Sequence, residues 1–389
     1  MTTALQKKTN LLARSAQYDL CGHCSPAGSG RIRDSEHTWI YPAVLPDGRA
    51  VRLLKVLQTN ICKNDCSYCA HRSSQDIPRE TFSPDELAQL FMDLHHARMA
   101  HGLFLSSAIP GNPDHGMARM IATAEILRRR FRFNGYIHLK VLPGACRAAV
   151  ERSAMYADRI SINLEAPGPD VLGRIAKDKD FISAILPQAA WIQQAVEDPL
   201  IRAGSHTTQF VVGAGGETDQ EILRWTDWLY RRRSLGRAYF SAYQVPDENT
   251  PLSARPVPLM REHRLYQADF LLRRYGFSFD ELVFEPTADL SLEVDPKQQW
   301  ALDHPEYFPV EILKAPLELL LRVPGIGPVS VKRICTLRIK GLVHSPEDLR
   351  KAGVVMKRTA PYVMLDGKPL QAGRTVAATE QMELPYACL

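Results

Sequence analysis

The feature that most constrains the fold is a regular alternation of short apolar segments with longer ones that suit helices. Six apolar segments have strand-like composition, and they cover residues 51–58, 103–109, 136–142, 159–164, 207–212 and 238–243. The stretches between them are long enough for crossover helices. This order predicts right-handed βαβ units, and therefore an α/β fold whose parallel sheet is either doubly wound or curled into a partial barrel.

One of the intervening segments carries explicit helix signals. Ser83 is a candidate N-cap, Pro84 occupies the first helical position, and Glu86 completes a capping box. The apolar residues that follow lie on one helix face: Leu87, Leu90, Phe91 and Leu94. We expect this helix to stop before Gly102.

Composition is that of a globular protein. The chain has 389 residues, of which 45% are hydrophobic and 23% charged, enough to bury a large core. The start, MTTALQKKTN, lacks the features of a signal peptide, and no apolar run approaches the roughly 20 residues of a membrane span. We expect a cytoplasmic protein without membrane contacts, whose eight cysteines bind metal or stay free rather than form disulfides.

Three of the cysteines lie in one short stretch. Cys62, Cys66 and Cys69 have the spacing C-x3-C-x2-C and follow the first strand-like segment, at the end of the sheet where α/β proteins hold their chemistry. A tetrahedral iron or zinc needs four ligands, so three thiolates leave one position open. The alternatives are a zinc site closed by His71 and three buried cysteines without metal.

This spacing, with Tyr68 before the last cysteine and a (βα)6-like pattern around it, resembles the radical S-adenosylmethionine (SAM) superfamily. The resemblance implies a partial (βα)6 TIM-like barrel and a 4Fe-4S cluster on Cys62, Cys66 and Cys69, with the fourth iron left for SAM. It also implies reductive cleavage of SAM to a 5′-deoxyadenosyl radical that abstracts hydrogen from a substrate, and hence a reducing electron donor.

The same resemblance implies residues that bind SAM. Tyr68 is expected beside the adenine, and Ser106 and Ser107 near the methionine amino group. Asn163 and Glu165, which share a strand face, are similar to residues that bind the ribose and amino groups in biotin-synthase-like members. QFVVGAGGETD is similar to the fifth-strand motif that approaches adenine, which assigns this role to Val212, Gly213, Gly215 and Gly216.

Other polar residues have two interpretations. Arg174, Lys177 and Lys179 are candidates for binding the SAM carboxylate, although solvated helix charge is favoured for most of them. His138 and Lys140 belong either to the pocket or to the core. The pair Cys21 and Cys24 could form half of a second metal site, but no other close cysteine pair completes it, so we expect no second metal.

Positive charge is concentrated near the C-terminus. Residues 314–358 contain ten Lys or Arg and three Asp or Glu, a local charge of +7 in a chain of net charge +5. Within them, PGIG (324–327) and its flanks resemble a helix-hairpin-helix element, in which a glycine turn and the following helix bind phosphate. We therefore expect nucleic-acid contacts from Gly325, Gly327, Lys332, Arg333, Lys357 and Arg358, with a packing hairpin as the alternative.

Almost the whole chain resembles a group of radical SAM proteins to which DNA modification or repair is ascribed, together with a uracil-DNA-glycosylase-like partner. The segment 294–312 and the early VRLLKVLQTNIC carry this likeness. It implies an N-terminal extension (1–48), a radical SAM core (49–290), and a small helical C-terminal region (291–389) whose hairpin spans about 312–358. Two alternatives stay open: a radical SAM enzyme acting on RNA or a small molecule, and a non-catalytic, zinc-containing nucleic-acid-binding adaptor.

Overall fold

The computed structural model of the protein describes residues 3–16, 40–44, 50–245 and 255–370. The chain divides into two compact units. Of these residues, unit 1 contains 3–16, 40–44, 50–217, 228–245 and 255–259, and unit 2 contains 218–227 and 260–370. Residues 260–290, which we expected in the core, thus belong to unit 2. The division into compact units does not test where the functional domains begin and end, so the domain boundaries expected from the sequence stay a prediction.

Unit 1 is built around a seven-stranded sheet in the order β1-β2-β3-β4-β5-β6-β7. Strands β2 to β7 are mutually parallel, and β1 pairs antiparallel with β2 at one edge. Their bounds are Ile40–Val44, Ala50–Leu57, Gly102–Ser106, Tyr136–Lys140, Arg159–Ser161, Ser205–Val212 and Arg237–Ala242. The six predicted strands and their parallel arrangement are confirmed. Strand β1 was not predicted, because its Pro42 disfavours a strand unless the strand lies at the edge of a sheet. The structure places β1 at such an edge.

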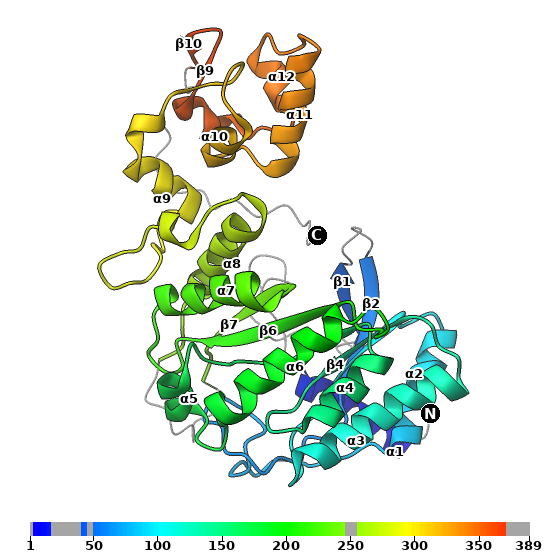
Figure 1. Cartoon of the computed structure of the whole chain (residues 1–389). Coiled ribbons are helices and arrows are strands. Elements are labelled where there is room, and N and C mark those ends of the chain that lie inside the picture. The colour runs from blue at the N-terminus through cyan, green and yellow to red at the C-terminus, as the bar shows by residue number, and fades with distance from the viewer. Residues whose placement is uncertain (1–2, 17–39, 45–49, 246–254, 371–389) are drawn as a thin grey trace. The chain divides into compact units, whose positions relative to one another are not determined.

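The sheet is an open, curled half-barrel whose connections contain helices (Figure 1). The helical segments of unit 1 are α1 (Thr3–Ser15), α2 (Pro84–His96), α3 (Pro113–Glu125), η3 (Ile126–Arg130), α4 (Arg147–Tyr156), α5 (Pro169–Ile175), η4 (Phe181–Ile185) and α6 (Leu186–Glu197). Helix α7 (Asp219–Arg233) begins in unit 2 and ends in unit 1. No helix among the described residues is both long and apolar enough to cross a membrane.

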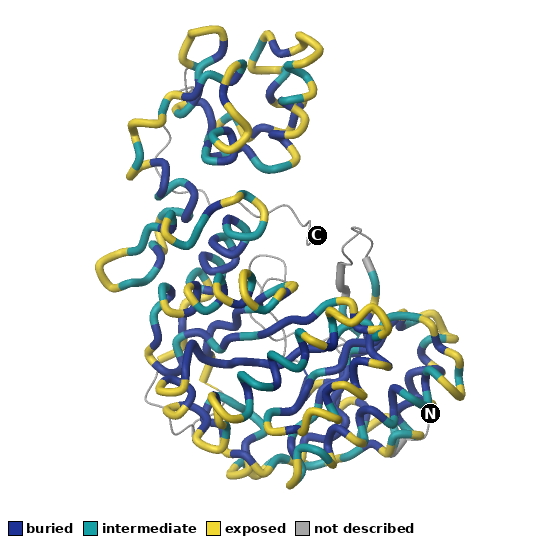
Figure 2. Tube along the Cα trace, in the orientation of Figure 1, coloured by how far each residue is buried: buried dark blue, intermediate teal, exposed yellow. Residues whose placement is uncertain are grey.

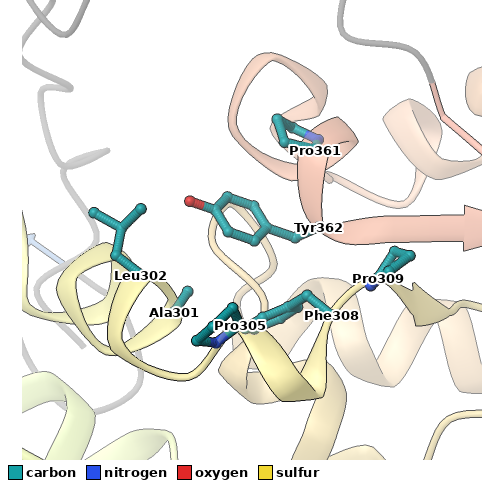
Figure 3. Close-up of a pocket in the computed structure, with 7 residues that line it drawn as sticks. All are labelled: Ala301, Leu302, Pro305, Phe308, Pro309, Pro361 and Tyr362. Atoms are coloured by element: carbon teal, nitrogen blue, oxygen red, sulfur yellow. The ribbon is translucent and has the colours of Figure 1, made fainter.

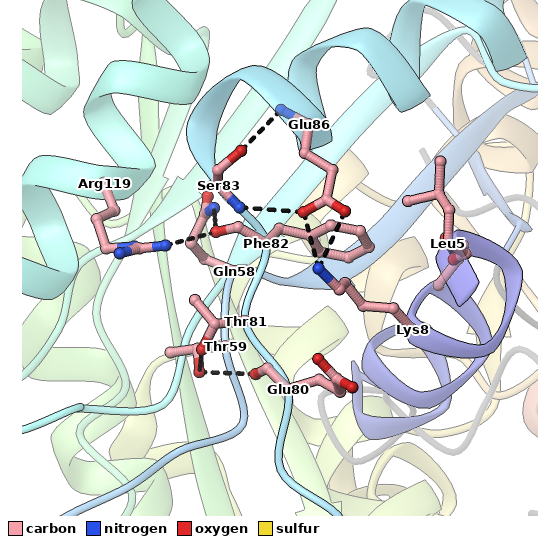
Figure 4. A network of polar contacts seen from close by, with 11 residues as sticks. Leu5, Lys8, Gln58, Thr59, Glu80, Thr81, Phe82, Ser83, Glu86 and Arg119 are labelled. Carbon is pink, nitrogen blue, oxygen red and sulfur yellow. Dashed lines mark hydrogen bonds and ion pairs between the residues drawn. The ribbon is translucent and has the colours of Figure 1, made fainter. Parts of the chain in front are cut away.

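Helix α2 begins at the predicted residue. The Ser83 hydroxyl accepts a hydrogen bond from Glu86 N at 3.1 Å, and the Glu86 carboxylate accepts one from Ser83 N at 3.3 Å, so the capping box is complete. Lys8 of α1 donates to the same carboxylate at 3.0 Å (Figure 4). The carbonyl of Phe82 accepts from Arg119 at 2.7 Å, which ties the start of α2 to α3 as well.

The end of α2 differs from the expected glycine stop. The helix ends at His96, and Arg98 adopts the left-handed conformation with φ 57°. Gly102 is instead the first residue of β3, where an added Cβ would lie 2.8 Å from both Leu53 Cδ2 and Tyr136 O. Close packing between neighbouring strands therefore explains this glycine.

The two faces of the sheet differ in composition. One face packs beneath the helices and is fully buried (Figures 1 and 2). Its side chains include Leu54, Val56, Leu103, Leu105, Ile137, Leu139, Ile160, Phe210 and Phe240, all 0% exposed. Full burial of such side chains contributes about 1.5–3 kcal/mol each, so this face holds the helices on the sheet. The opposite face carries polar and aromatic residues.

Unit 2 has its own core, to which Leu320, Ile326, Ile334, Leu349 and Val363 contribute. Its elements are α8 (Leu259–Arg274), η5 (Phe279–Glu281), α9 (Pro296–Asp303), η6 (Pro305–Tyr307), α10 (Leu317–Arg322), α11 (Pro328–Ile339), α12 (Pro346–Lys351), α13 (Met356–Thr359), η7 (Ala360–Tyr362) and the strands β8 (Val310–Glu311), β9 (Val363–Leu365) and β10 (Lys368–Pro369). The three strands form a sheet in the order β10-β9-β8. The sequence predicted only helices in this region. Its strands are too short to show the alternation of apolar and polar residues that identifies a strand.

Helices α10 and α11 flank the glycine turn at residues 323–327. Gly325 has φ 83°, and an added Cβ would lie 2.4 Å from Thr359 Oγ1 and 2.8 Å from Val355 O. Val355 N also donates to Gly325 O at 3.0 Å. The absence of a side chain at Gly325 is thus required by packing inside unit 2.

We expect Gly325→Ala to destabilise unit 2 by about 3 kcal/mol, because left-handed strain of about 1 kcal/mol adds to steric overlap of about 2 kcal/mol. Gly341→Ala is the matched control: Gly341 has φ 63° but open space around its Cβ position, so only the strain applies. Hydrogen exchange of peptides from residues 317–365 measures both changes. Equal destabilisation by the two substitutions would contradict the packing role of Gly325.

Candidate functional site

The loop after β2 carries three cysteines at the carboxyl edge of the sheet. Cys66 is buried, and Cys62 and Cys69 are half-buried. The loop is compact, since Cys69 N donates to Cys66 O at 2.9 Å. His71 N donates to the Cys69 sulfur at 3.4 Å. Backbone donors to sulfur are typical of cysteines prepared to act as thiolate ligands.

The thiols influence one another electrostatically. Burial raises the pKa of Cys66, and Cys62 raises it further, whereas Lys179 lowers it. Burial and then the charge of Cys66 raise the pKa of Cys69 to about 12. Without a cation, the Cys66 and Cys69 thiols stay protonated at neutral pH. A bound metal centre would reverse that preference, because its positive charge stabilises thiolates.

The donor set fits a multi-iron cluster better than a single ion. Among the described residues, no three His, Cys, Asp or Glu side chains converge on a position for one metal ion. A 4Fe-4S cluster does not require convergence, because each thiolate binds a different iron. The ring of His71, the alternative zinc ligand, contacts Ser15 O at 3.1 Å. In the same loop, the buried Asn64 Oδ1 has no hydrogen-bond partner.

A buried ion pair lies beside the cysteine loop. Lys179 Nζ donates to Glu165 Oε1 at 2.9 Å and to Tyr68 Oη at 2.7 Å. The side chains of Lys179 and Glu165 are only 9% and 8% exposed. Asn163 donates to the other Glu165 oxygen at 3.3 Å. The structure thus brings Tyr68, Asn163 and Glu165 together, as the sequence interpretation requires, although their contacts with SAM stay a prediction.

Opposing effects set the charge states of this group. Burial alone would raise the pKa of Glu165, but the Lys179 and Lys140 amines lower it below its usual value. Burial alone would lower the pKa of Lys179, but the Glu165 carboxylate produces a net increase. Burial and the Glu165 charge raise the pKa of Tyr68. At neutral pH the group therefore consists of a carboxylate, an ammonium and a neutral phenol.

The backbone of Glu165 is in an unusual conformation. Its φ is 66°, in the left-handed region that residues other than glycine rarely adopt, at a cost of order 1 kcal/mol. Strand β6 holds it on both sides: Glu165 N donates to Gln209 O at 2.9 Å, and Val211 N donates to Glu165 O at 2.8 Å. The strained backbone directs the carboxylate toward Lys179.

Residues 175–179 fasten the cysteine loop at several points. Ser67 donates to Ile175 O from both its N–H and its hydroxyl, each at 2.9 Å. Asp65 N donates to the Asp178 carboxylate at 2.7 Å. With the Lys179 to Tyr68 contact, these bonds connect the loop after β2 to the loop after α5. We call residues 175–179 the clamp.

The clamp corrects one interpretation of the sequence. Solvated helix charge was favoured for most of Arg174, Lys177 and Lys179. It fits the exposed Lys177 and Arg174, although Arg174 also donates to Gly215 O. Lys179 is instead buried and ion-paired. The sequence could not reveal these partners, which lie 14 and 41 positions away.

The glycine turn after β6 is stabilised by Glu217, which was not among the site residues predicted from the sequence. The Glu217 carboxylate, 3% exposed, accepts from Gly213 N and from Gly215 N. Gly213 and Gly216 have φ of 82° and 78°, and an added Cβ at Gly215 would lie 2.5 Å from Val171 Cγ1. Turn geometry and packing on α5 thus account for these glycines; an adenine contact at the turn, including Val212, stays a prediction.

The two serines at the end of β3, Ser106 within the strand and Ser107 after it, differ in their contacts. Ser106 is buried, and its carbonyl accepts from Gln58 N at 2.8 Å. The Ser107 hydroxyl donates to Ala108 O at 2.7 Å within the same loop. Their proposed contact with the methionine amino group is untested. Cys21 and Cys24 lie outside the described residues.

The basic residues expected to bind nucleic acid lie in unit 2. Lys332 and Arg333, on α11, and Lys357, on α13, are exposed. Arg358 is half-buried and forms an ion pair with Asp295. That pair neutralises Arg358, so it is a poorer candidate for phosphate binding than its neighbours. Gly327 is the N-cap of α11.

Unit 2 also contains an apolar pocket (Figure 3). It is lined by Ala301, Leu302, Pro305, Phe308, Pro309, Pro361 and Tyr362. Apart from the Tyr362 hydroxyl, its lining side chains are apolar. The pocket therefore lacks groups for acid, base or metal chemistry, and the cysteine loop is the stronger candidate site.

A family model matches a segment that contains the cysteine loop. The model of the radical SAM superfamily matches residues 56–229. None of the curated proteins matches the chain. The FeFe-hydrogenase maturase HydG from Carboxydothermus hydrogenoformans is 15% identical, with 56% of this chain and 50% of that chain covered and a TM-score of 0.44. Streptococcus suis SuiB bound to S-adenosylmethionine is 11% identical, with 56% and 47% covered and a TM-score of 0.43.

Methylornithine synthase (PylB) is 13% identical, with 68% of this chain and 69% of that chain covered and a TM-score of 0.41. The chain spans about half the length of the HydG and SuiB structures.

We expect Lys179→Met to loosen the cysteine loop, because it removes the Tyr68 contact and leaves Glu165 buried without its cation. Hydrogen exchange of peptides covering residues 60–75 in the iron-free protein should become about tenfold faster, the factor for a loss of about 1.4 kcal/mol. Asp178→Ala, which removes only the acceptor of Asp65 N, should have a smaller effect of the same sign.

Lys177→Met is the control, since Lys177 is exposed in the same segment. Unchanged exchange in both Lys179→Met and Asp178→Ala would show that the clamp does not order the loop. Circular dichroism verifies that each variant is folded.

Proposed function

We propose that this chain is a radical SAM enzyme in which Cys62, Cys66 and Cys69 hold a 4Fe-4S cluster beside a SAM site, because the model of that superfamily matches residues 56–229. The observation that carries this proposal is that Cys62, Cys66 and Cys69 lie in one loop, close enough for their charges to act on one another, within the segment that the superfamily model matches. When bound, the cluster and SAM supply reductive radical chemistry that removes hydrogen from a substrate. The chain supplies binding, orientation and exclusion of water.

Several residues suit the binding of SAM. The Glu165 carboxylate and the Asn163 amide offer an acceptor and a donor for its amino and ribose groups. The Tyr68 ring offers a flat surface for adenine. Their burial limits access of water, which protects a reactive intermediate from unwanted donors.

For the substrate, we propose nucleic acid, and DNA in particular. The net charge of +7 over residues 314–358 and the exposed Lys332 and Arg333 beside the start of α11 support phosphate contacts. A base in a duplex would have to be unstacked before it met the site, unless it is already single-stranded. A reducing protein as electron donor and a uracil-DNA-glycosylase-like protein as partner belong to the same proposal.

A second candidate function is radical chemistry on a small molecule, with the hairpin serving only to pack unit 2. The contacts of Gly325 with Thr359 and Val355 favour this alternative, because they explain a glycine without any ligand. For the same reason, glycine substitutions are poor tests of DNA binding. Substitution of exposed basic residues tests DNA binding without disturbing the core of unit 2.

We expect the wild-type protein, reconstituted without oxygen, to contain about four irons and four sulfides per chain. Substitution of Cys62, Cys66 or Cys69 by Ala should lower the iron content severalfold and remove the absorption of the cluster. Cys146→Ser, at an exposed cysteine of unit 1, is the control and should keep full iron. Stoichiometric zinc without iron in the wild type would support the adaptor alternative and contradict the proposal.

We expect the double variant Lys332→Gln/Arg333→Gln to bind duplex DNA about a hundredfold more weakly, because each of the two lost phosphate contacts weakens binding by about 1.5 kcal/mol. The slope of log affinity against log salt should fall by about 1.8 for two contacts on a duplex. Lys368→Gln, at an exposed lysine of β10, serves as the control. An unchanged slope in the double variant, measured by fluorescence anisotropy, would favour the small-molecule function.

A further inference from the structure

The sheet face opposite the helices carries aligned polar side chains. The strand register places Lys55, Phe104, His138 and Arg159 in one row across β2 to β5. The adjacent row toward the carboxyl edge contains Lys140, Ser161, Thr207 and Arg237. Because side chains alternate along strands, both rows lie on the same face. The Lys140 charge acts on Glu165, so this polar face continues to the candidate site.

Positive charge predominates on this face. Burial, and then the charges of Arg159, Lys55 and Lys140, lower the pKa of His138 well below its usual value. The neutral ring is bonded to the Ser161 hydroxyl at 2.8 Å. None of the residues in the two rows is acidic. The nearby carboxylates of Glu165 and Asp158 pair with Lys179 and Arg128, respectively.

Aromatic rings stand among these cations. Lys55 Nζ lies 4.7 Å from the centroid of Phe104, whose ring meets that of His138 edge-on at 4.5 Å. The Arg237 guanidinium lies 4.9 Å from the centroid of Tyr239. Surfaces that combine cations with aromatic rings bind unpaired nucleotides, because rings stack on bases and cations contact phosphates.

Some of these residues are accessible. Lys55 and His138 are buried, whereas Lys140, Arg159 and Arg237 are half-buried. Lys140 on β4 and Arg237 on β7 are three strand spacings apart, about 14 Å along the sheet, and Arg159 on β5 lies between them. A small molecule with one carboxylate needs a single cation, whereas three cations over this span suit successive phosphates.

We propose that this face binds a single-stranded nucleotide segment of the substrate, with its phosphates on Lys140, Arg159 and Arg237 and a base against Tyr239. The inference rests on the proposed function and deepens it, since it assigns substrate contacts to unit 1 itself. In this arrangement the nucleotide extends from the amino ends of β5 and β7, where Arg159 and Arg237 lie, to Lys140 at the carboxyl end of β4, whose charge acts on Glu165.

Binding of a fluorescent thymidine trinucleotide to the full chain tests the inference by fluorescence anisotropy. Arg159→Gln and Lys140→Met should each raise Kd about tenfold, as expected for a lost charge-assisted hydrogen bond. Together they should lower the slope of log affinity against log salt by about 1.4, two contacts at about 0.7 each for a single strand. Arg159→Lys should restore most of the affinity, because the charge is kept.

Arg147→Gln is the matched control, since Arg147 is an exposed arginine of α4 in the same unit. The same series is then measured in a chain that carries Lys332→Gln/Arg333→Gln, which removes the expected phosphate contacts of unit 2. The loss of trinucleotide affinity on Arg159→Gln should persist in that chain. Pyrophosphate should compete with the trinucleotide. Equal competition by succinate would overturn the assignment to a nucleotide.

Iron and sulfide analysis of the same preparations keeps the two proposals distinguishable. Folded Arg159→Gln and Lys140→Met variants with full iron and unchanged trinucleotide affinity would overturn this inference and leave the cluster proposal standing. A wild type without iron whose trinucleotide binding depends on Arg159 and Lys140 would overturn the cluster proposal and support the nucleotide face.

Discussion

The parallel register of β2 to β7 is the constraint on which the rest of unit 1 depends. It brings the carboxyl ends of the strands to one edge, so the loops after β2 and β5 meet although their sequences lie a hundred residues apart. The alternation of side chains also gives the sheet two unlike faces. The apolar face holds the helices, which leaves the polar face for a ligand.

At that shared edge, the ion pair of Lys179 and Glu165 connects three loops. It joins the cysteine loop through Tyr68, the end of β5 through Glu165, and the segment after α5 through Lys179 itself. A buried ion pair contributes little net stability, because desolvation offsets attraction, but it fixes geometry strongly. Its role here is to join the cysteine loop to the segments after β5 and α5.

The sequence predicted what depends on local periodicity and spacing: the six parallel strands, the capped start of α2 at Ser83 and the cysteine loop. It missed contacts between distant segments, such as the pairing of Lys179 and the capping of the glycine turn by Glu217, because no spacing rule specifies them. Packing demands on glycines are also hidden in a sequence: Gly102, Gly215 and Gly325 each lie where an added Cβ would meet neighbouring atoms.

The left-handed backbone of Glu165 has a consequence for how this position can vary. Glycine would relieve the conformation and lose the carboxylate, whereas β-branched residues would suffer the full steric penalty. Aspartate and asparagine tolerate the conformation, but their shorter side chains would not reach as far toward the Lys179 amine. Few amino acids meet both demands, so an evolving lineage has little freedom here and is expected to retain glutamate wherever the clamp lysine is retained.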